Sequence, residues 1–264
     1  MFQVAGALIV GAALLQVVVM LVSSLSRFSY GIEQRRLALE MLRARVAAAA
    51  AQSQVERDRV SLSWQGTRKF RIDRKVLEGG DIGSFYLVPH DGKPLPPFNP
   101  GQYLTFQMKI PGQDKPVIRC YSLSDSPAAR DYYRVSIKRV PPPRDKPDLP
   151  PGLSSSFFHD QLEEESILDV KAPHGNFYLD MNTHAPVVLI GGGIGVTPVL
   201  SMLNAICASG SKRETWVFYG VRNSQEHIMK EHLARLAQEN ENVHLHVCYS
   251  DPEKKDVIGK DYQH

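Results

Sequence analysis

The segment RCYSLSDSP at 119–127 contains four residues that suit a ligand with both a phosphate and an aromatic ring: Arg119, Tyr121, Ser122 and Ser124. In an extended strand Arg119 and Tyr121 point to one side and Ser122 to the other, because successive side chains alternate. The segment thus offers a cation, an aromatic plane, and hydroxyl and amide donors. A flavin dinucleotide requires that set. We therefore expect a flavin site here, although a strand tyrosine taken alone is more often a packing residue.

A second candidate is the glycine-rich run GGGIGVTP at 191–198, which follows an apolar stretch and precedes a predicted helix. Glycines let the backbone approach a phosphate closely, and the free N–H groups and dipole of a helix N-terminus favour an anion. The run does not have the G-x-G-x-x-G spacing of the dinucleotide fingerprint. A purely structural strand-to-helix turn is therefore an open alternative.

The first segment lies within a series of short β-like runs that extends from Trp64 to about residue 180. Six strands are predicted, at 68–78, 82–89, 103–110, 118–124, 132–140 and 166–172. Strands at this spacing, separated by Gly and Pro breaks, indicate an antiparallel barrel or sandwich. The proline-rich run 141–152 predicts a surface loop, because proline suits neither helix nor central strand.

From Ala185 the pattern changes to alternating strands and helices. Strands are predicted at 187–190, 215–220 and 243–249, and helices at 197–208 and 225–239. Apolar strands joined by crossover helices predict a parallel sheet covered on both faces. The glycine-rich run connects the first of these strands to the first helix.

The N-terminus predicts a membrane anchor followed by a stalk. Residues 4–22 have only Gln16 as a strongly polar interruption, and about 20 apolar residues are enough to cross a bilayer. Arginines follow within the next 20 residues, which places the rest of the chain in the cytoplasm. We expect a single-pass anchor at 1–26 in the inner or plasma membrane, and a helical stalk at 27–63. A signal peptide or buried helix, and pairing of the stalk with a second copy, are open alternatives.

Composition excludes other classes of function. The 264 residues have a net charge of +3 without a basic block, so we expect no nucleic-acid partner. Cys120, Cys207 and Cys248 lie too far apart in sequence for a metal or iron–sulfur motif. His227 and His232 lie five residues apart on a predicted helix and diverge, whereas His244 and His246 share one strand face but lack a third ligand. We predict no metal site.

The combination of motifs resembles the ferredoxin-NADP reductase-like flavoproteins, which include flavohaemoglobin reductase domains, cytochrome b5 reductases and oxygenase reductases. The resemblance covers about 64–264 and rests on R-x-Y-S at 119–122, GQYLTF at 101–106, GLSSSFFHD at 152–160, GNF at 175–177 and GGGIGVTPVLSML at 191–203. It implies an antiparallel β-barrel FAD domain at 64–183. It also implies an α/β parallel-sheet, Rossmann-like NAD(P) domain at 184–264.

The resemblance assigns a role to each motif of the FAD domain. It implies that Arg119 binds the flavin pyrophosphate, that Tyr121 lies beside the ring system, and that Ser122 lies near its N5 atom. Tyr121 and Ser122 are therefore the expected catalytic residues, with Ser124 expected as a further cofactor ligand. Its phosphate-binding turn implies that Gly152, Ser154 and Ser155 contact the FAD phosphates.

For the second domain the resemblance implies a nicotinamide cofactor next to Gly193, Gly195, Thr197 and Pro198. Asp251 follows the third predicted strand, and its carboxylate would repel a 2'-phosphate but accept bonds from a ribose. We therefore expect NADH, with NADPH less favoured. NADPH is an open alternative because Arg222 could bind its 2'-phosphate, and because Asp251 could be a plain turn residue.

The chain departs from the family pattern in two ways. Only three of the family's roughly five parallel strands are predicted, and its Cys-Gly motif near the C-terminus has no match, so we expect a C-terminally truncated, incomplete NAD(P) domain. Nor does the sequence show an electron outlet, which relatives often carry as an iron–sulfur domain. We expect a membrane-anchored reductase that moves hydride from NADH to FAD and passes electrons to an iron–sulfur or other one-electron acceptor. The alternative is a non-catalytic flavin-binding or scaffold protein.

Overall fold

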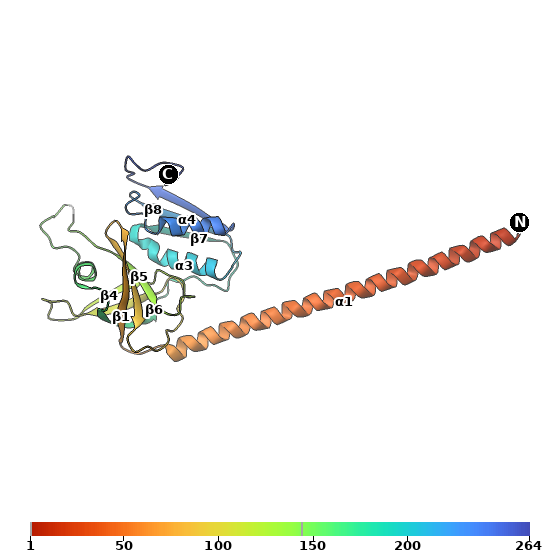
Figure 1. The fold of residues 1–264 in the computed structure, drawn as a ribbon, viewed down its shortest axis with the longest axis horizontal. Helices are drawn as coiled ribbons and strands as arrows, with labels where there is room; N and C mark the ends of the chain where they lie inside the picture. The colour runs from red at the N-terminus through yellow and green to blue at the C-terminus, as the bar shows by residue number, and fades with distance from the viewer. Residues whose placement is uncertain (1, 144) are drawn as a thin grey trace. The chain divides into compact units, whose positions relative to one another are not determined.

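The computed structural model describes residues 2–143 and 145–264, except for the side chains of 2–13, 25, 26, 29 and 31 (Figure 1). Contacts divide the chain into two units, Met1–Arg57 and Asp58–His264. Helix α1, Phe2–Leu62, makes up the first unit and runs into the second. Along it Arg36 pairs with Glu40 one turn later, at 3.2 Å, as the predicted stalk requires.

The predicted membrane anchor needs correction. In the part of the chain that the structure describes, no helix is long and apolar enough to cross a bilayer. The side chains of residues 1–13, 25 and 26 in the predicted span lie outside the described part of the chain. The predicted transmembrane helix at 1–26 and the inner or plasma membrane location are therefore wrong.

The second unit begins with a six-stranded antiparallel barrel. Its strands are β1 (Arg68–Gly79), β2 (Ile82–Pro89), β3 (Tyr103–Met108), β4 (Val117–Ser122), β5 (Tyr133–Lys138) and β6 (Ile167–His174). They pair in the order β4-β3-β6-β1-β2-β5, and a bridge between Leu123 and Val135 joins the two outer strands. The prediction of an antiparallel barrel is confirmed, with every strand within about two residues of its expected bounds.

Alternation of side chains explains how the barrel forms its core. In β3, Leu104, Phe106 and Met108 are buried, while the residues between them are only partly covered. The inner side chains join Phe70, Phe85 and Phe158 in one apolar cluster. Phe158 comes from outside the sheet, from the helical segment α2 (Leu153–Ser156) and η1 (Phe157–Gln161). This segment therefore closes the barrel core.

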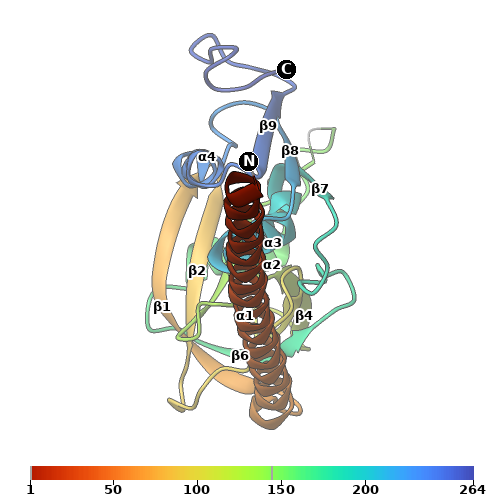
Figure 2. The same cartoon turned by 90° about the vertical axis from the view of Figure 1, so that its right-hand side faces the viewer.

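The α/β domain follows with a three-stranded parallel sheet (Figure 2). Its elements are β7 (Val187–Gly192), η2 (Gly193–Gly195), α3 (Val196–Ala208), β8 (Thr215–Val221), α4 (Lys230–Glu239) and β9 (Val243–Tyr249). The strands pair in the order β7-β8-β9, as predicted from the alternating pattern. Helix α4 begins five residues later than predicted, because 222–229 forms a series of turns that ends at Met229 with a φ of 52°.

The expected cover on both faces of this sheet is not observed. Helices α3 and α4 both pack on the face that carries Leu189, Val217 and Val247. On the opposite face Val188 and Ile190 are exposed by 58% and 74%. Two successive right-handed crossovers in one direction place both helices on the same side, which explains the difference.

Gly101 lies where the barrel, the segment after β6 and α3 meet. Its φ is +109°, and a Cβ atom there would lie 2.6 Å from the carbonyl oxygen of Phe177 and 2.5 Å from Cε of Met202. Gly112 also has a positive φ, of +79°, but a Cβ atom there would meet nothing within 4 Å. The two glycines therefore separate backbone strain from crowding.

We predict that Gly101→Ala destabilises the protein far more than Gly112→Ala. Both changes place an L residue at positive φ, which costs about 1 to 2 kcal/mol. Only Gly101→Ala adds overpacking, which costs about 1 to 3 kcal/mol more. Urea unfolding followed by circular dichroism measures both free energies. Equal losses for the two variants would show that the junction has room for a methyl group.

Candidate functional site

Strand β4 presents Tyr121 on the barrel surface. Its ring is half-buried and packs edge-on against Phe106 and Phe158, with ring centroids 5.7 and 5.2 Å away. Burial raises the pKa of Tyr121 to about 12, and the charge of Arg119 opposes that rise. Arg119 therefore lies close enough for its charge to act on the Tyr121 hydroxyl. The structure brings these two predicted site residues together.

The neighbours of Tyr121 divide into exposed and buried groups. Arg119 is exposed and donates a hydrogen bond to the carbonyl of Ile118 at 2.7 Å, and Ser122 is half-buried at the end of β4. Ser124, in contrast, is fully buried. Its hydroxyl lies 2.9 Å from that of Ser136 and accepts a bond from Nε of Arg134 at 3.2 Å. Ser124 is thus part of the barrel interior.

Helix α2 and the turn before it contain the predicted phosphate ligands, and two buried hydroxyls of α2, those of Ser154 and Ser156, have no partner among the described residues. The N–H of Gly152 donates to the carbonyl of Val140 at 2.9 Å, and the Ser155 hydroxyl donates to the carbonyl of Gly152 at 3.0 Å. These two predicted ligands therefore shape the turn itself. The Ser154 hydroxyl is buried and has no hydrogen-bond partner among the described residues. Because buried hydroxyls are normally bonded, this group is suited to a ligand oxygen.

The turn and β4 belong to one site. The helical segment that starts at Leu153 runs on to Phe158, whose ring contacts that of Tyr121. The first N–H groups of a helix have no partner within it. The cation and aromatic ring of β4 are thus connected, through the contact of Tyr121 with Phe158, to the segment that carries the buried Ser154 hydroxyl and the first N–H groups of α2. These residues fit the pyrophosphate and ring system of a flavin dinucleotide.

The glycine-rich run forms a tight connection between β7 and α3. Gly193 has a φ of +50°, and at Gly191 a Cβ atom would approach Cα of Val196 to 2.9 Å. Thr197 is buried and donates to the carbonyl of Ile194 at 3.0 Å. Pro198 lies in the first turn of α3, where a proline needs no N–H partner. The chain thus places the start of α3 directly after β7.

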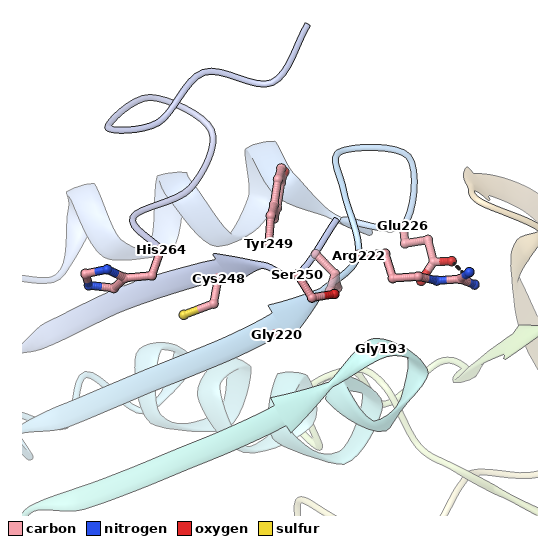
Figure 3. A pocket seen from close by; sticks show the side chains of 9 residues that line it. Gly193, Gly220, Arg222, Glu226, Cys248, Tyr249, Ser250 and His264 are labelled. Carbon is pink, nitrogen blue, oxygen red and sulfur yellow. Dashed lines mark ion pairs between the residues drawn. The ribbon is translucent and has the colours of Figure 1, made fainter. Parts of the chain in front are cut away.

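A pocket of about 400 Å³ opens at the carboxyl ends of the three parallel strands (Figure 3). The residues that line it are Gly193, Gly220, Val221, Arg222, Glu226, Cys248, Tyr249, Ser250 and His264. In open α/β sheets this end is where ligands bind. The predicted site residues Gly195, Thr197, Pro198 and Asp251 are not in the lining. Asp251 is exposed, and its N–H donates to the carbonyl of Arg222 at 2.8 Å.

Glu226 is a pocket residue that sequence reasoning missed. Its Oε1 atom lies 2.6 Å from a guanidinium nitrogen of Arg222 and 2.9 Å from Nζ of Lys138 on β5. Burial alone would raise the pKa of Glu226, but hydrogen bonds from Lys138 and Arg222 hold that pKa below its usual value. Arg222 and Glu226 are four residues apart, a spacing that allows an ion pair. The predicted helix began at 225, between the two residues, so the pair was not recognised.

Asp125 joins the barrel to the α/β domain at a second point. Its carboxylate lies 3.3 Å from the guanidinium of Arg134 and accepts a bond from Asn204 on α3 at 3.3 Å. Its carbonyl accepts a bond from the hydroxyl of Ser201 at 2.7 Å. The β1–β2 hairpin forms a further contact, because at Gly80 a Cβ atom would lie 2.6 Å from the carbonyl oxygen of Gln225.

Two family profiles match this unit. The oxidoreductase FAD-binding domain matches 71–178, and the oxidoreductase NAD-binding domain matches 189–263. The chain is 41% identical over 196 residues to a flavohemoprotein of Halalkalibacterium halodurans, covering 74% of this chain and 47% of that protein. A flavohemoprotein of Rhodopirellula baltica is 45% identical over 195 residues, covering 74% and 47%. The chain thus spans about half the length of these curated relatives.

Solved structures agree with this similarity. The flavohem-like FAD/NAD binding domain of nitric oxide dioxygenase from Vibrio cholerae has 29% identity and a TM-score of 0.64, covering 74% of this chain and 78% of that one. Phthalate dioxygenase reductase, described as a modular structure for electron transfer from pyridine nucleotides to [2Fe-2S], has 30% identity and a TM-score of 0.58. The alignment with this reductase covers 74% of the present chain and 55% of the reductase chain. The chain therefore shares both its barrel domain and its parallel-sheet domain with these structures.

We predict that His227, which contacts the pocket residue Tyr249, makes the free energy of unfolding fall in mild acid. It is 6% exposed, its Nδ1 lies 2.9 Å from the Tyr249 hydroxyl, and burial lowers its pKa to about 4. Between pH 6.5 and 4 the unfolded chain binds this proton and the folded chain does not, so up to about 3 kcal/mol is lost as pH falls through that window. Urea unfolding across this range should give a shallower pH slope for His227→Gln than for wild type. His184→Gln, at an exposed position, should keep the wild-type slope, and an unchanged slope for His227→Gln would contradict the prediction.

Proposed function

Because the chain belongs to the ferredoxin-NADP reductase-like family of FAD-dependent NAD(P)H oxidoreductases, we propose that it oxidises NADH and passes the electrons singly to an acceptor. The observation that carries the proposal is the contact of Tyr121, beside Arg119, with Phe158 of the segment that contains the unpartnered Ser154 hydroxyl. FAD, when bound, accepts hydride and releases electrons one at a time. The protein supplies binding and orientation.

The barrel residues have separate tasks in this proposal. Arg119 binds the pyrophosphate, with the Ser154 hydroxyl and the first N–H groups of α2 as further donors. Gly152 and Ser155 hold the shape of that turn through their own hydrogen bonds. Tyr121 lies against the ring system, and its contacts with Phe106 and Phe158 keep its orientation. Ser122, at the end of the same strand, is the donor near the ring nitrogens.

The α/β domain binds the nicotinamide nucleotide in this proposal. Gly193 lines the pocket, and the run through Gly195, Thr197 and Pro198 brings the N-terminus of α3 toward it. The helix dipole there favours the nucleotide phosphates. We assign NADH as the preferred reductant, with NADPH less favoured. Asp251 would act near the ribose only through movement of its exposed loop, and Ser250 lines the pocket instead.

We assign a haem protein or haem domain as the electron acceptor. The curated relatives at 41% and 45% identity are flavohemoproteins, and a solved flavohemoglobin contains FAD and heme. An iron–sulfur acceptor is the alternative, which phthalate dioxygenase reductase illustrates. Reduction rates with cytochrome c, a bacterial haemoglobin and a [2Fe-2S] ferredoxin would rank the acceptors. A yellow protein that oxidises NADH with none of these acceptors, nor with ferricyanide, would refute the function.

We predict that Arg119→Ala lowers FAD retention of the full chain by about tenfold or more, because a charge-assisted bond to phosphate is lost. The ratio of flavin absorbance near 450 nm to protein absorbance after gel filtration measures retention. Lys93→Ala, which removes an exposed charge from a barrel turn, is the matched control. Equal retention by the two variants would contradict the assignment of Arg119.

A further inference from the structure

The nucleotide pocket contains a cluster of three charged groups with unequal exposure. Arg222 and Lys138 both approach the same carboxylate oxygen, Oε1 of Glu226, at 2.6 and 2.9 Å. The Glu226 side chain is only 15% exposed, whereas those of Lys138 and Arg222 are 22% and 44% exposed. Figure 3 shows the Arg222–Glu226 pair at the side of the pocket, next to Ser250. The carboxylate is thus the fixed centre of the cluster.

This arrangement determines which anions the pocket accepts. A 2'-phosphate is bound best by an arginine whose planar donors are free to form two parallel bonds. Glu226 occupies one donor nitrogen of Arg222 and also the Lys138 ammonium group. Its negative charge also offsets one of the two positive charges that could attract a 2'-phosphate. A ribose 2'-hydroxyl, in contrast, can donate a hydrogen bond to a carboxylate.

We infer that Glu226 is the residue that selects NADH over NADPH, by holding the donors of Arg222 and Lys138 and by lowering the positive charge available to a 2'-phosphate. This inference rests on the proposed function and names its specificity determinant. It moves the discriminating carboxylate from Asp251, which lies outside the pocket lining, to Glu226, which lies inside it. Because Lys138 belongs to the barrel, the selection involves both domains.

The test compares the binding of NAD+ and NADP+ by isothermal titration calorimetry, so it does not require turnover. In wild type NAD+ should bind more tightly. Glu226→Gln keeps the shape and removes the charge, and it should raise the affinity for NADP+ relative to NAD+ by about tenfold. Glu239→Gln removes the same charge at the far end of α4 and should leave the ratio unchanged. Adding Arg222→Leu to Glu226→Gln should abolish the gain.

Each outcome decides the inference. A Glu226→Gln ratio within twofold of wild type, with both nucleotides bound, would overturn it and leave the proposed function standing. Failure of wild type to bind either nucleotide would instead refute the proposed function. If Glu226→Gln does not fold, Arg222→Leu alone decides. The inference holds if that change leaves the NADP+ to NAD+ ratio near wild type, and fails if NADP+ binding weakens selectively, because Arg222 would then already read the phosphate.

Discussion

The site depends on the contact between two domains, and Asp125 is central to that contact. The Asp125 carboxylate faces Arg134, which is 8% exposed, and it reaches Asn204 on α3. Both members of this charge pair belong to the barrel, so the pair holds the orientation of the carboxylate that the α/β domain contacts. The bonds that join the two domains here are those from Asn204 to the Asp125 carboxylate and from the Ser201 hydroxyl to the Asp125 carbonyl.

The regular elements were predictable because each follows a local rule. Leu104, Phe106 and Met108 alternate with less buried residues, so β3 could be placed from its period of two. The apolar strands of the α/β domain likewise predicted their own parallel pairing. The start of α4 could not be predicted in this way. The side chain of Asn223 accepts a hydrogen bond from the N–H of Gln225, and the side chain of Asp256 accepts one from the N–H of Ser224. These side-chain contacts favour turns over a helix.

The motifs of the candidate site could be predicted from the sequence, but the hydrogen-bond partner of each side chain could not. The sequence placed Arg119 beside Tyr121, but it gave no sign that the Ser124 hydroxyl would be used inside the barrel by Ser136 and Arg134. Such a bond joins residues that are distant in sequence, so a motif cannot contain it. The Lys138–Glu226 pair has the same character, since its members lie in different domains. The predicted membrane anchor was wrong, since within the described residues no helix has the length and apolar character of a membrane span.

The β1–β2 hairpin has a consequence for the position of the pocket residue Glu226. Its tip at Gly80 touches the backbone of Gln225, one residue before Glu226, and only a residue without a side chain fits there. The hairpin tip therefore packs directly against the loop that carries Glu226. A bulkier tip would have to displace this loop, and the carboxylate of Glu226 would move with it.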